Sequence, residues 1–103
     1  MPPVTGGDVT VVVVTLDAVS GRVEASGMIP TLSEDGGRCT LTLRQGELVR
    51  TAEVDATAAR DVTYCGLVTI PVTDLGPGQW TAALSYVSAS HSGVSAEKTV
   101  NVS

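Results

Sequence analysis

The chain is poor in several residue types, and each shortage excludes a class of protein. Its 103 residues include no Phe, one Trp, one His and one Lys, and 11 acidic residues face only 6 basic ones. The resulting net charge of −5 repels phosphate backbones, so nucleic-acid binding is not expected. The longest aliphatic run, residues 11–14, is far too short to span a bilayer. No basic amphipathic helix suggests attachment to a membrane surface.

An export signal is also lacking at the start of the chain. Met1, Pro2 and Pro3 supply neither a charged segment nor the apolar segment that follows it in a signal peptide. We therefore expect any export signal to lie outside this sequence and neighbouring domains of a longer chain to flank it. Residues 1–8 are expected to form a flexible N-terminal segment, and residues 9–103 a single domain.

The residues that are abundant favour β-structure. The chain contains 17 Val and 13 Thr, whose branching at Cβ suits a pleated, half-buried strand. A hydrophobic fraction of 43% is too high for a disordered chain. The low content of Lys, Asn, Phe and Ile, together with abundant Ala, Gly, Val and Thr, suggests a bacterial source with GC-rich DNA.

Seven segments have the alternation of strands and are separated by turn residues. Residues 22–29 alternate cleanly, and in residues 79–87 the side chains of Trp80, Leu84 and Tyr86 share one face. No stretch shows helical periodicity. The pattern predicts an all-β, antiparallel sandwich of about seven strands. The predicted strands are residues 9–16, 22–29, 38–44, 48–57, 62–72, 79–87 and 94–102.

Two places in this pattern are ambiguous. Residues 58–61 could form a short helical turn or a loop. In residues 62–72, Cys65 and Leu67 would share one face while Val68 and Ile70 share the other, and a bulge at Gly66 would resolve this conflict.

The only two cysteines, Cys39 and Cys65, lie in two predicted strands. Free buried thiols and a zinc site are the alternatives to a disulfide, but one distant His makes a poor zinc set. We predict a structural disulfide between Cys39 and Cys65, which places the domain in an extracellular or cell-surface setting.

The last 28 residues resemble a known family. Gly78 opens a strand that ends in Tyr86, and after a polar loop Val100, Asn101 and Val102 close the chain. This arrangement is similar to the final hairpin of bacterial immunoglobulin-like domains. The resemblance implies an immunoglobulin-like sandwich, and a role as a module that spaces, displays or binds in surface proteins, adhesins and extracellular enzymes.

The cysteines depart from the antibody-type pattern within the same fold. Antibody domains join the second and sixth strands and carry a Trp on the third. Here Cys39 and Cys65 fall on the predicted third and fifth strands, and Trp80 begins the sixth. The resemblance is therefore to the bacterial domains, and the receptor biology of antibody domains is not implied.

Candidate sites for catalysis and metal binding are weak. His91 lies in a Ser-rich loop, residues 88–93, which contains residue types of a Ser–His–Asp triad but no nucleophile elbow, and we expect an exposed loop histidine. Ser33, Glu34 and Asp35 could offer oxygen ligands to calcium, but they fall short of the six to eight that calcium takes. We expect no enzyme activity, no metal and no cofactor.

Three further features have a structural and a functional interpretation. Trp80 and Tyr86 fill the core or, if exposed, form a sugar-binding platform. Lys98 would join an isopeptide bond only if it were buried beside an Asp such as Asp8 or Asp17. The Asn101 sequon at the chain end has no assigned role.

The predicted function is a non-catalytic immunoglobulin-like module of a secreted or surface-anchored bacterial protein, serving as a spacer or as an adhesion or ligand-binding unit. Its partner would be a protein or a carbohydrate. The alternative is a stand-alone secreted binder, a carbohydrate-binding protein or an inhibitor, that uses the loops 30–37 and 75–79 at one end of the sandwich. The Val-rich first strand should be paired or covered, because an open apolar edge promotes aggregation.

Overall fold

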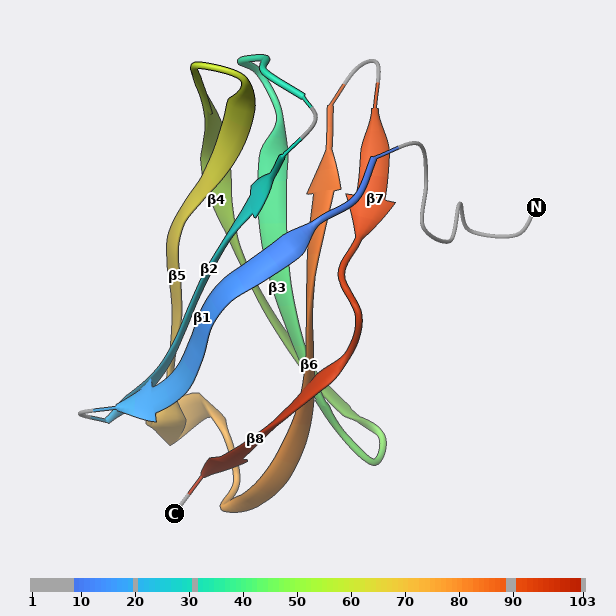
Figure 1. Cartoon of the computed structure of the whole chain (residues 1–103). Coiled ribbons are helices and arrows are strands. Elements are labelled where there is room, and N and C mark those ends of the chain that lie inside the picture. Colours follow the sequence, from blue (N-terminus) through green and yellow to red (C-terminus); the bar gives the residue numbers. More distant parts are fainter. Residues whose placement is uncertain (1–8, 20, 31, 89–90, 103) are drawn as a thin grey trace.

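The structure is a computed structural model that describes residues 9–19, 21–30, 32–88 and 91–102. Figure 1 shows an arrangement of antiparallel strands connected by short turns. One turn of 3-10 helix, η1 (Val72–Asp74), follows the fifth strand. The strands are β1 (Val12–Val19), β2 (Arg22–Ile29), β3 (Arg38–Gln45), β4 (Leu48–Ala59), β5 (Val62–Pro71), β6 (Gly78–Val87), β7 (Ser92–Val94) and β8 (Lys98–Val102).

The strands form one sheet that folds over on itself. Their order is β1-β2-β5-β4-β3-β6-β7, and β8 also pairs with β6. The long strand β4 belongs to both halves, because residues 48–55 pair with β3 and residues 56–59 pair with β5. We call β1, β2, β5 and the end of β4 half A, and β3, the start of β4, β6, β7 and β8 half B.

β4 joins the two halves on one side of the fold, and on the opposite side the halves also come close together. The Val9 N–H donates a hydrogen bond of 3.2 Å to the Ser92 carbonyl, and β1 runs close to β8 (Figure 1). The fold is therefore almost a barrel. The predicted all-β, antiparallel architecture is confirmed, with seven to eight strands.

The core lies between the two halves and is filled by the alternate residues of each strand. The inward faces predicted for residues 22–29, 38–44 and 79–87 are confirmed, and the most deeply buried large side chains come from these strands. They are Val23, Ile29, Leu41, Leu43, Trp80, Leu84 and Tyr86.

The Cys39–Cys65 disulfide joins the halves through this core. It connects β3 to β5 with the two Cα atoms 5.7 Å apart, and both cysteines are buried. The predicted pairing is confirmed. A bond between strands of opposite halves prevents them from separating, which adds to the link that β4 already makes.

The bulge predicted at Gly66 is present. Ala25 pairs with Val68 and Gly27 pairs with Cys65, so two residues of β5 lie opposite Ser26. The extra residue turns Leu67 outward, and its side chain is 56% exposed. The bulge resolves the ambiguity of this strand, because Cys65 now faces the core together with Val68.

The largest departures from the predicted strands are in three places. The first strand is Val12–Val19 rather than residues 9–16. Of residues 58–61, Ala58 and Ala59 continue β4, and Arg60 and Asp61 form a tight turn in which Asp61 has a φ of 67°. The alternative of a helical turn is wrong. The predicted last strand, 94–102, is interrupted, because β7 ends at Val94 and β8 begins at Lys98.

Candidate functional site

The connections 30–37 and 75–79 lie at opposite ends of the molecule. Residue 37 precedes Arg38, which pairs with Val87 at one end of β6. At the other end, the Gln45 side-chain amide donates to the Pro77 carbonyl at 3.1 Å. A binding site formed by both loops together, as predicted, is therefore wrong. Loop 32–37 instead shares its end with the β4–β5 turn and with the β6–β7 connection, and we call this the loop end.

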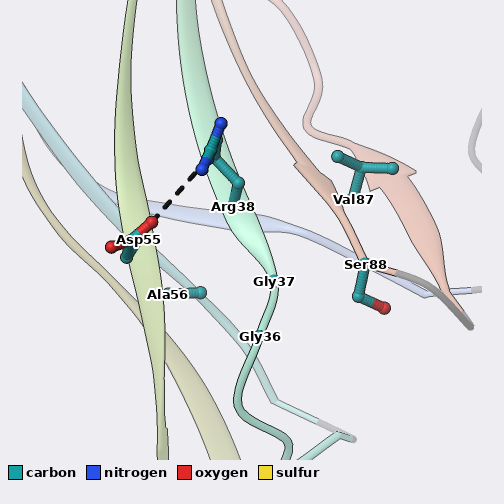
Figure 2. A pocket seen from close by; sticks show the side chains of 7 residues that line it. All are labelled: Gly36, Gly37, Arg38, Asp55, Ala56, Val87 and Ser88. Carbon is teal, nitrogen blue, oxygen red and sulfur yellow. Dashed lines mark ion pairs between the residues drawn. The ribbon is translucent and has the colours of Figure 1, made fainter.

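An open depression of about 530 Å³ lies beside the loop end (Figure 2). Its charged lining residues are Arg38 and Asp55, whose side chains are 3.7 Å apart, and Arg38 also pairs with Glu53 at 3.3 Å. The remaining lining is small or apolar: Gly36, Gly37, Ala56, Val87 and Ser88. The one cation at this depression is thus already paired with two carboxylates.

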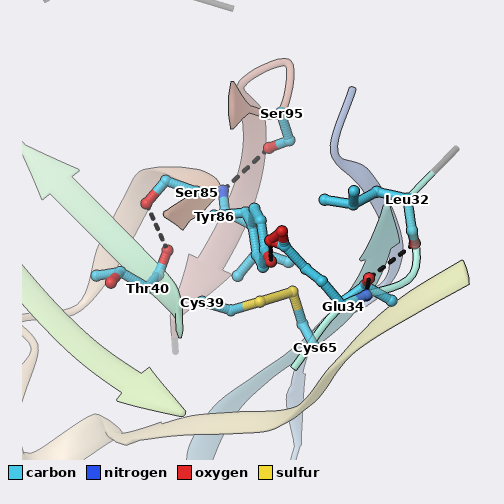
Figure 3. The surroundings of a disulfide bond; sticks show 10 residues. Leu32, Glu34, Cys39, Thr40, Cys65, Ser85, Tyr86 and Ser95 are labelled. Carbon is cyan, nitrogen blue, oxygen red and sulfur yellow. Dashed lines mark hydrogen bonds between the residues drawn. A yellow bond between two sulfur atoms is a disulfide. The ribbon is translucent and has the colours of Figure 1, made fainter. Parts of the chain in front are cut away.

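Glu34 connects loop 32–37 to its neighbours at the loop end, the start of β5 and the region where β6 ends and β7 begins. Its Oε2 accepts a 2.9 Å hydrogen bond from the Tyr86 hydroxyl, and its Oε1 lies 2.9 Å from His91 Nδ1. Its backbone N–H donates to Thr63 Oγ1, whose hydroxyl in turn donates to the Leu32 carbonyl. Figure 3 shows the Glu34 side chain beside Tyr86 and near the Cys39–Cys65 bond. The loop is therefore attached directly to the disulfide-linked core.

This environment shifts two pKa values. A hydrogen bond from Ser88, reinforced by those from Tyr86 and His91, lowers the pKa of Glu34 below its ordinary 4.5, although partial desolvation opposes the shift. Burial, together with the hydrogen bond to Glu34, raises the pKa of Tyr86. Both shifts favour a charged Glu34 beside a neutral Tyr86.

His91 is not the exposed loop histidine that was expected. Its side chain is 33% exposed and faces the Glu34 carboxylate. The Ser88 hydroxyl accepts a 3.0 Å hydrogen bond from the His91 backbone N–H, so this contact orders the loop backbone and not the imidazole ring. The pair of Glu34 and His91 thus contributes to holding the β6–β7 connection against loop 32–37.

The calcium interpretation of loop 33–37 finds no support in the contacts. Glu34 is bound as described, and Asp35 Oδ1 accepts the backbone N–H of Ala58 at 3.0 Å. The Ser33 hydroxyl donates to the Ala59 carbonyl at 2.6 Å. Within residues 9–19, 21–30, 32–88 and 91–102, no three His, Cys, Asp or Glu side chains gather in a group that could hold a metal ion.

A second recess, of about 370 Å³, lies on the outer face of half B, and we call it the outer groove. It forms where the last strand is interrupted between Val94 and Lys98. Its wall and floor come from β3, β6 and the interrupted segment: Thr42, Arg44, Thr81, Ala82, Ala83, Ser85, Val94, Ser95 and Glu97. Small side chains along β6 leave the recess between longer ones on either side.

Ser95 fixes the interruption that creates the groove. Its backbone N–H donates to the Leu84 carbonyl at 2.8 Å, and its hydroxyl oxygen accepts the Leu84 N–H at 3.0 Å. One residue thereby satisfies both backbone groups of Leu84, and Ala96 and Glu97 are left outside the strand pairing. The sign of this break in the sequence is the mainly polar stretch between Val94 and Val100, although residues 94–102 are predicted as one continuous strand.

The polar groups of the outer groove are not satisfied by one another. Among the described residues, the charged side chains of Arg44 and Glu97 have no hydrogen bond or ion pair, and the hydroxyls of Thr42 and Thr81 have none either. Ser85 makes only a 3.4 Å bond to the Thr40 carbonyl. The groove therefore has hydrogen-bonding capacity available for a ligand, whereas the Glu34 carboxylate at the loop end already bonds to Tyr86 and His91.

The outer face of half A carries an apolar row instead. Met28 pairs with Val12 on one side and Tyr64 on the other, so the three side chains lie next to each other across three strands. Tyr64 is 49% exposed, and the flanking Val14 and Leu67 are 57% and 56% exposed. The register therefore places an apolar row on the surface of half A, and β1 itself is paired with β2 as predicted.

The remaining predicted sites are accounted for by the fold. Trp80 and Tyr86 are each only 1% exposed, so the core interpretation is confirmed and the sugar platform is wrong. Lys98 is exposed on β8, as is Asp17 on β1, so the burial that an isopeptide bond needs is missing. Asp8 and the Ser103 of the sequon lie outside the described residues.

No family model, curated protein or solved structure matches this chain. The resemblance to bacterial immunoglobulin-like domains therefore stays a prediction. In the described part of the chain, no helix has the length and apolar character needed to cross a membrane.

Proposed function

We propose that the chain is a non-catalytic immunoglobulin-like module of a secreted or surface-anchored bacterial protein, where it acts as a spacer or as an adhesion or ligand-binding unit. The strand order supports the fold assignment. Immunoglobulin-type domains place their first, second, fifth and fourth strands in one sheet and the third, sixth and seventh in the other. β1, β2 and β5 lie in half A, and β3, β6 and the pair β7 and β8 lie in half B, in agreement with this order. The fourth strand, β4, pairs with β5 over residues 56–59 and with β3 over residues 48–55.

The disulfide supports the compartment. Structural disulfides persist in secreted and surface proteins and are rare where thiols are kept reduced. Cys39 and Cys65 are buried and link two strands of the core, so their role is structural.

The proposed ligand-binding role rests on a difference between the loop end and the outer groove in how their polar groups are bonded. At the loop end, Glu34 bonds to Tyr86 and His91 and so holds loop 32–37 against the core. The outer groove presents polar groups of β3, of β6 and of Glu97 that have no intramolecular partner among the described residues, which suits ligand binding. The exposed apolar row on half A suits contact with a neighbouring domain or protein.

A stand-alone carbohydrate-binding protein is the second candidate, and the outer groove is the observation that favours it. This second function requires the same compartment and the same groove, but it requires no neighbouring domains. The flanking gene sequence separates the two, since repeats or a wall anchor support the module and an immediate stop supports the stand-alone binder.

The compartment is tested on the protein in its native cells. Cell fractionation with an antibody should find it outside the cytoplasm, and non-reducing mass spectrometry of that material should give a mass lower by two hydrogens than the reduced form. Recovery from the cytoplasm with two free thiols would contradict the proposal.

A further inference from the structure

We propose that the outer groove binds a carboxylated sugar, a unit of the uronic acid type, with Arg44 holding the carboxylate. This inference rests on the proposed ligand-binding role and names its ligand class. It follows from the spacing of the charges, the chemistry of the groups between them and the lack of aromatic residues in the lining.

The spacing selects the size of the ligand. Arg44 lies on β3 and Glu97 lies just before β8, and both strands flank β6. Thr99 is the residue level with Arg44 across β6, and Glu97 lies two positions before it. With strands about 4.8 Å apart and a rise of about 3.4 Å per residue, the two backbones are separated by about 12 Å. A sugar ring with its substituents can reach both side chains. An amino acid suits the site less well, because its ammonium and carboxylate groups are attached to the same carbon atom.

The chemistry along the groove selects the functional groups of the ligand. The Arg44 guanidinium donates only, and its planar fork binds a carboxylate through two parallel hydrogen bonds. The Glu97 carboxylate accepts only, so it requires a donor such as a sugar hydroxyl. The hydroxyls of Thr42, Thr81 and Ser85 line the rest of the groove, on β3 and β6, and can both donate and accept. A carboxylate at one end and hydroxyls along the rest complement this order.

The lining also argues against a neutral sugar. None of the residues of the groove is aromatic, so a ring has no surface on which to stack. A neutral sugar would also make no charge-assisted, bidentate contact with the Arg44 guanidinium. The net charge of −5 does not prevent an anion from binding, because charges farther away than about 8 Å are largely screened at physiological ionic strength.

The test is a titration of the 15N-labelled protein with sodium glucuronate, followed by amide chemical shifts. Saturable shifts are expected at Thr42, Thr81, Ala83 and Ser85, and glucose and sodium acetate should give much smaller ones. The variant Arg44→Gln should bind glucuronate about tenfold more weakly, because it loses a charge-assisted, bidentate contact.

Arg60→Gln is the matched control. Arg60 is exposed in the β4–β5 turn, and among the described residues it has no ion pair or hydrogen bond. Its loss changes the net charge as much as the loss of Arg44 but lies away from the groove, so glucuronate binding should be unchanged. An equal loss in both variants would show a non-specific charge effect and overturn the site.

Other outcomes also decide the question. Equal binding of glucose and glucuronate would overturn the role of the carboxylate, and shifts confined to residues outside the groove would overturn its location. No saturable shift with glucuronate would overturn the ligand class. That failure is distinct from failure of the proposed function, which depends on the compartment and the state of the cysteines.

Discussion

The loop end and the outer groove contain similar polar residues but use them differently. At the loop end, Glu34 binds Tyr86 and His91, and Arg38 pairs with Glu53 and Asp55. In the groove, Arg44 and Glu97 have no intramolecular partner among the described residues. Residue types alone therefore do not identify a binding site. A better criterion is whether the polar side chains lack hydrogen-bond partners within the protein.

This comparison predicts that variants at the loop end affect stability and that variants in the groove do not. The largest effect is expected from the disulfide beneath the loop end. Replacing both Cys39 and Cys65 by Ala should lower the free energy of unfolding by about 3–4 kcal/mol, since the bond closes a loop of 26 positions in the unfolded chain. Urea unfolding of the oxidised wild type and the double variant measures this difference. Equal midpoints would show that the bond adds nothing to the link made by β4.

A glycine of the loop end should have the next largest effect. A Cβ atom at Gly37 would overlap the ring and hydroxyl of Tyr86, whose side chain is fixed in the core. Gly37→Ala should cost about 1–3 kcal/mol, as overpacking does elsewhere. Gly36→Ala is a useful contrast, because a Cβ there meets no atom and only its φ of 92° opposes the change. Thermal unfolding of both variants compares steric overlap with backbone strain.

Glu34 should make stability depend on pH. Its pKa is lowered in the fold, so its ionised form stabilises the protein above the ordinary value of 4.5, and this contribution is lost as the pH falls through the lower, folded value. Glu34→Gln should therefore flatten the decline in stability between about pH 5 and pH 3. Unfolding curves across this range test the prediction, and an unchanged slope would assign the decline to other carboxylates.

The smallest effect on stability is expected in the groove. Arg44→Gln and Glu97→Gln should each change the free energy of unfolding by no more than about 0.5 kcal/mol, because these exposed side chains contact no partner. A larger loss of unfolding free energy in either variant would show that the groove side chains stabilise the fold, as those of the loop end do.

Much of the fold could be predicted from alternation. The inward faces of β2, β3 and β6 follow from apolar residues at every second position, and the bulge at Gly66 follows from the conflict between Cys65 and Val68. Alternation is a local property, so it does not show which loops meet in space. The number of strands between two loops does show this. Loops 30–37 and 75–79 are separated by three antiparallel strands, so they must lie at opposite ends of the fold.

The candidate site was missed because it depends on an interruption and not on a motif. Ser95 looks like any polar residue of a strand, and only the pairing of its hydroxyl with Leu84 shows that the strand breaks there. The prediction of an exposed His91 is wrong for a related reason. Its partner Glu34 is 57 positions away, and nothing in the local sequence of either residue predicts the contact.

The position of the disulfide has a consequence for a molecule that is pulled by its two ends. β1 and β8 lie at the nearly closed side, while the Cys39–Cys65 bond lies farther in along the chain from both ends. Force would therefore detach the outer strands first, and the chain between the cysteines would not lengthen while the bond persists. At about 3.5 Å per residue, that closed loop withholds about 90 Å of extension. The bond thus limits how far the domain can be stretched as well as how readily it unfolds.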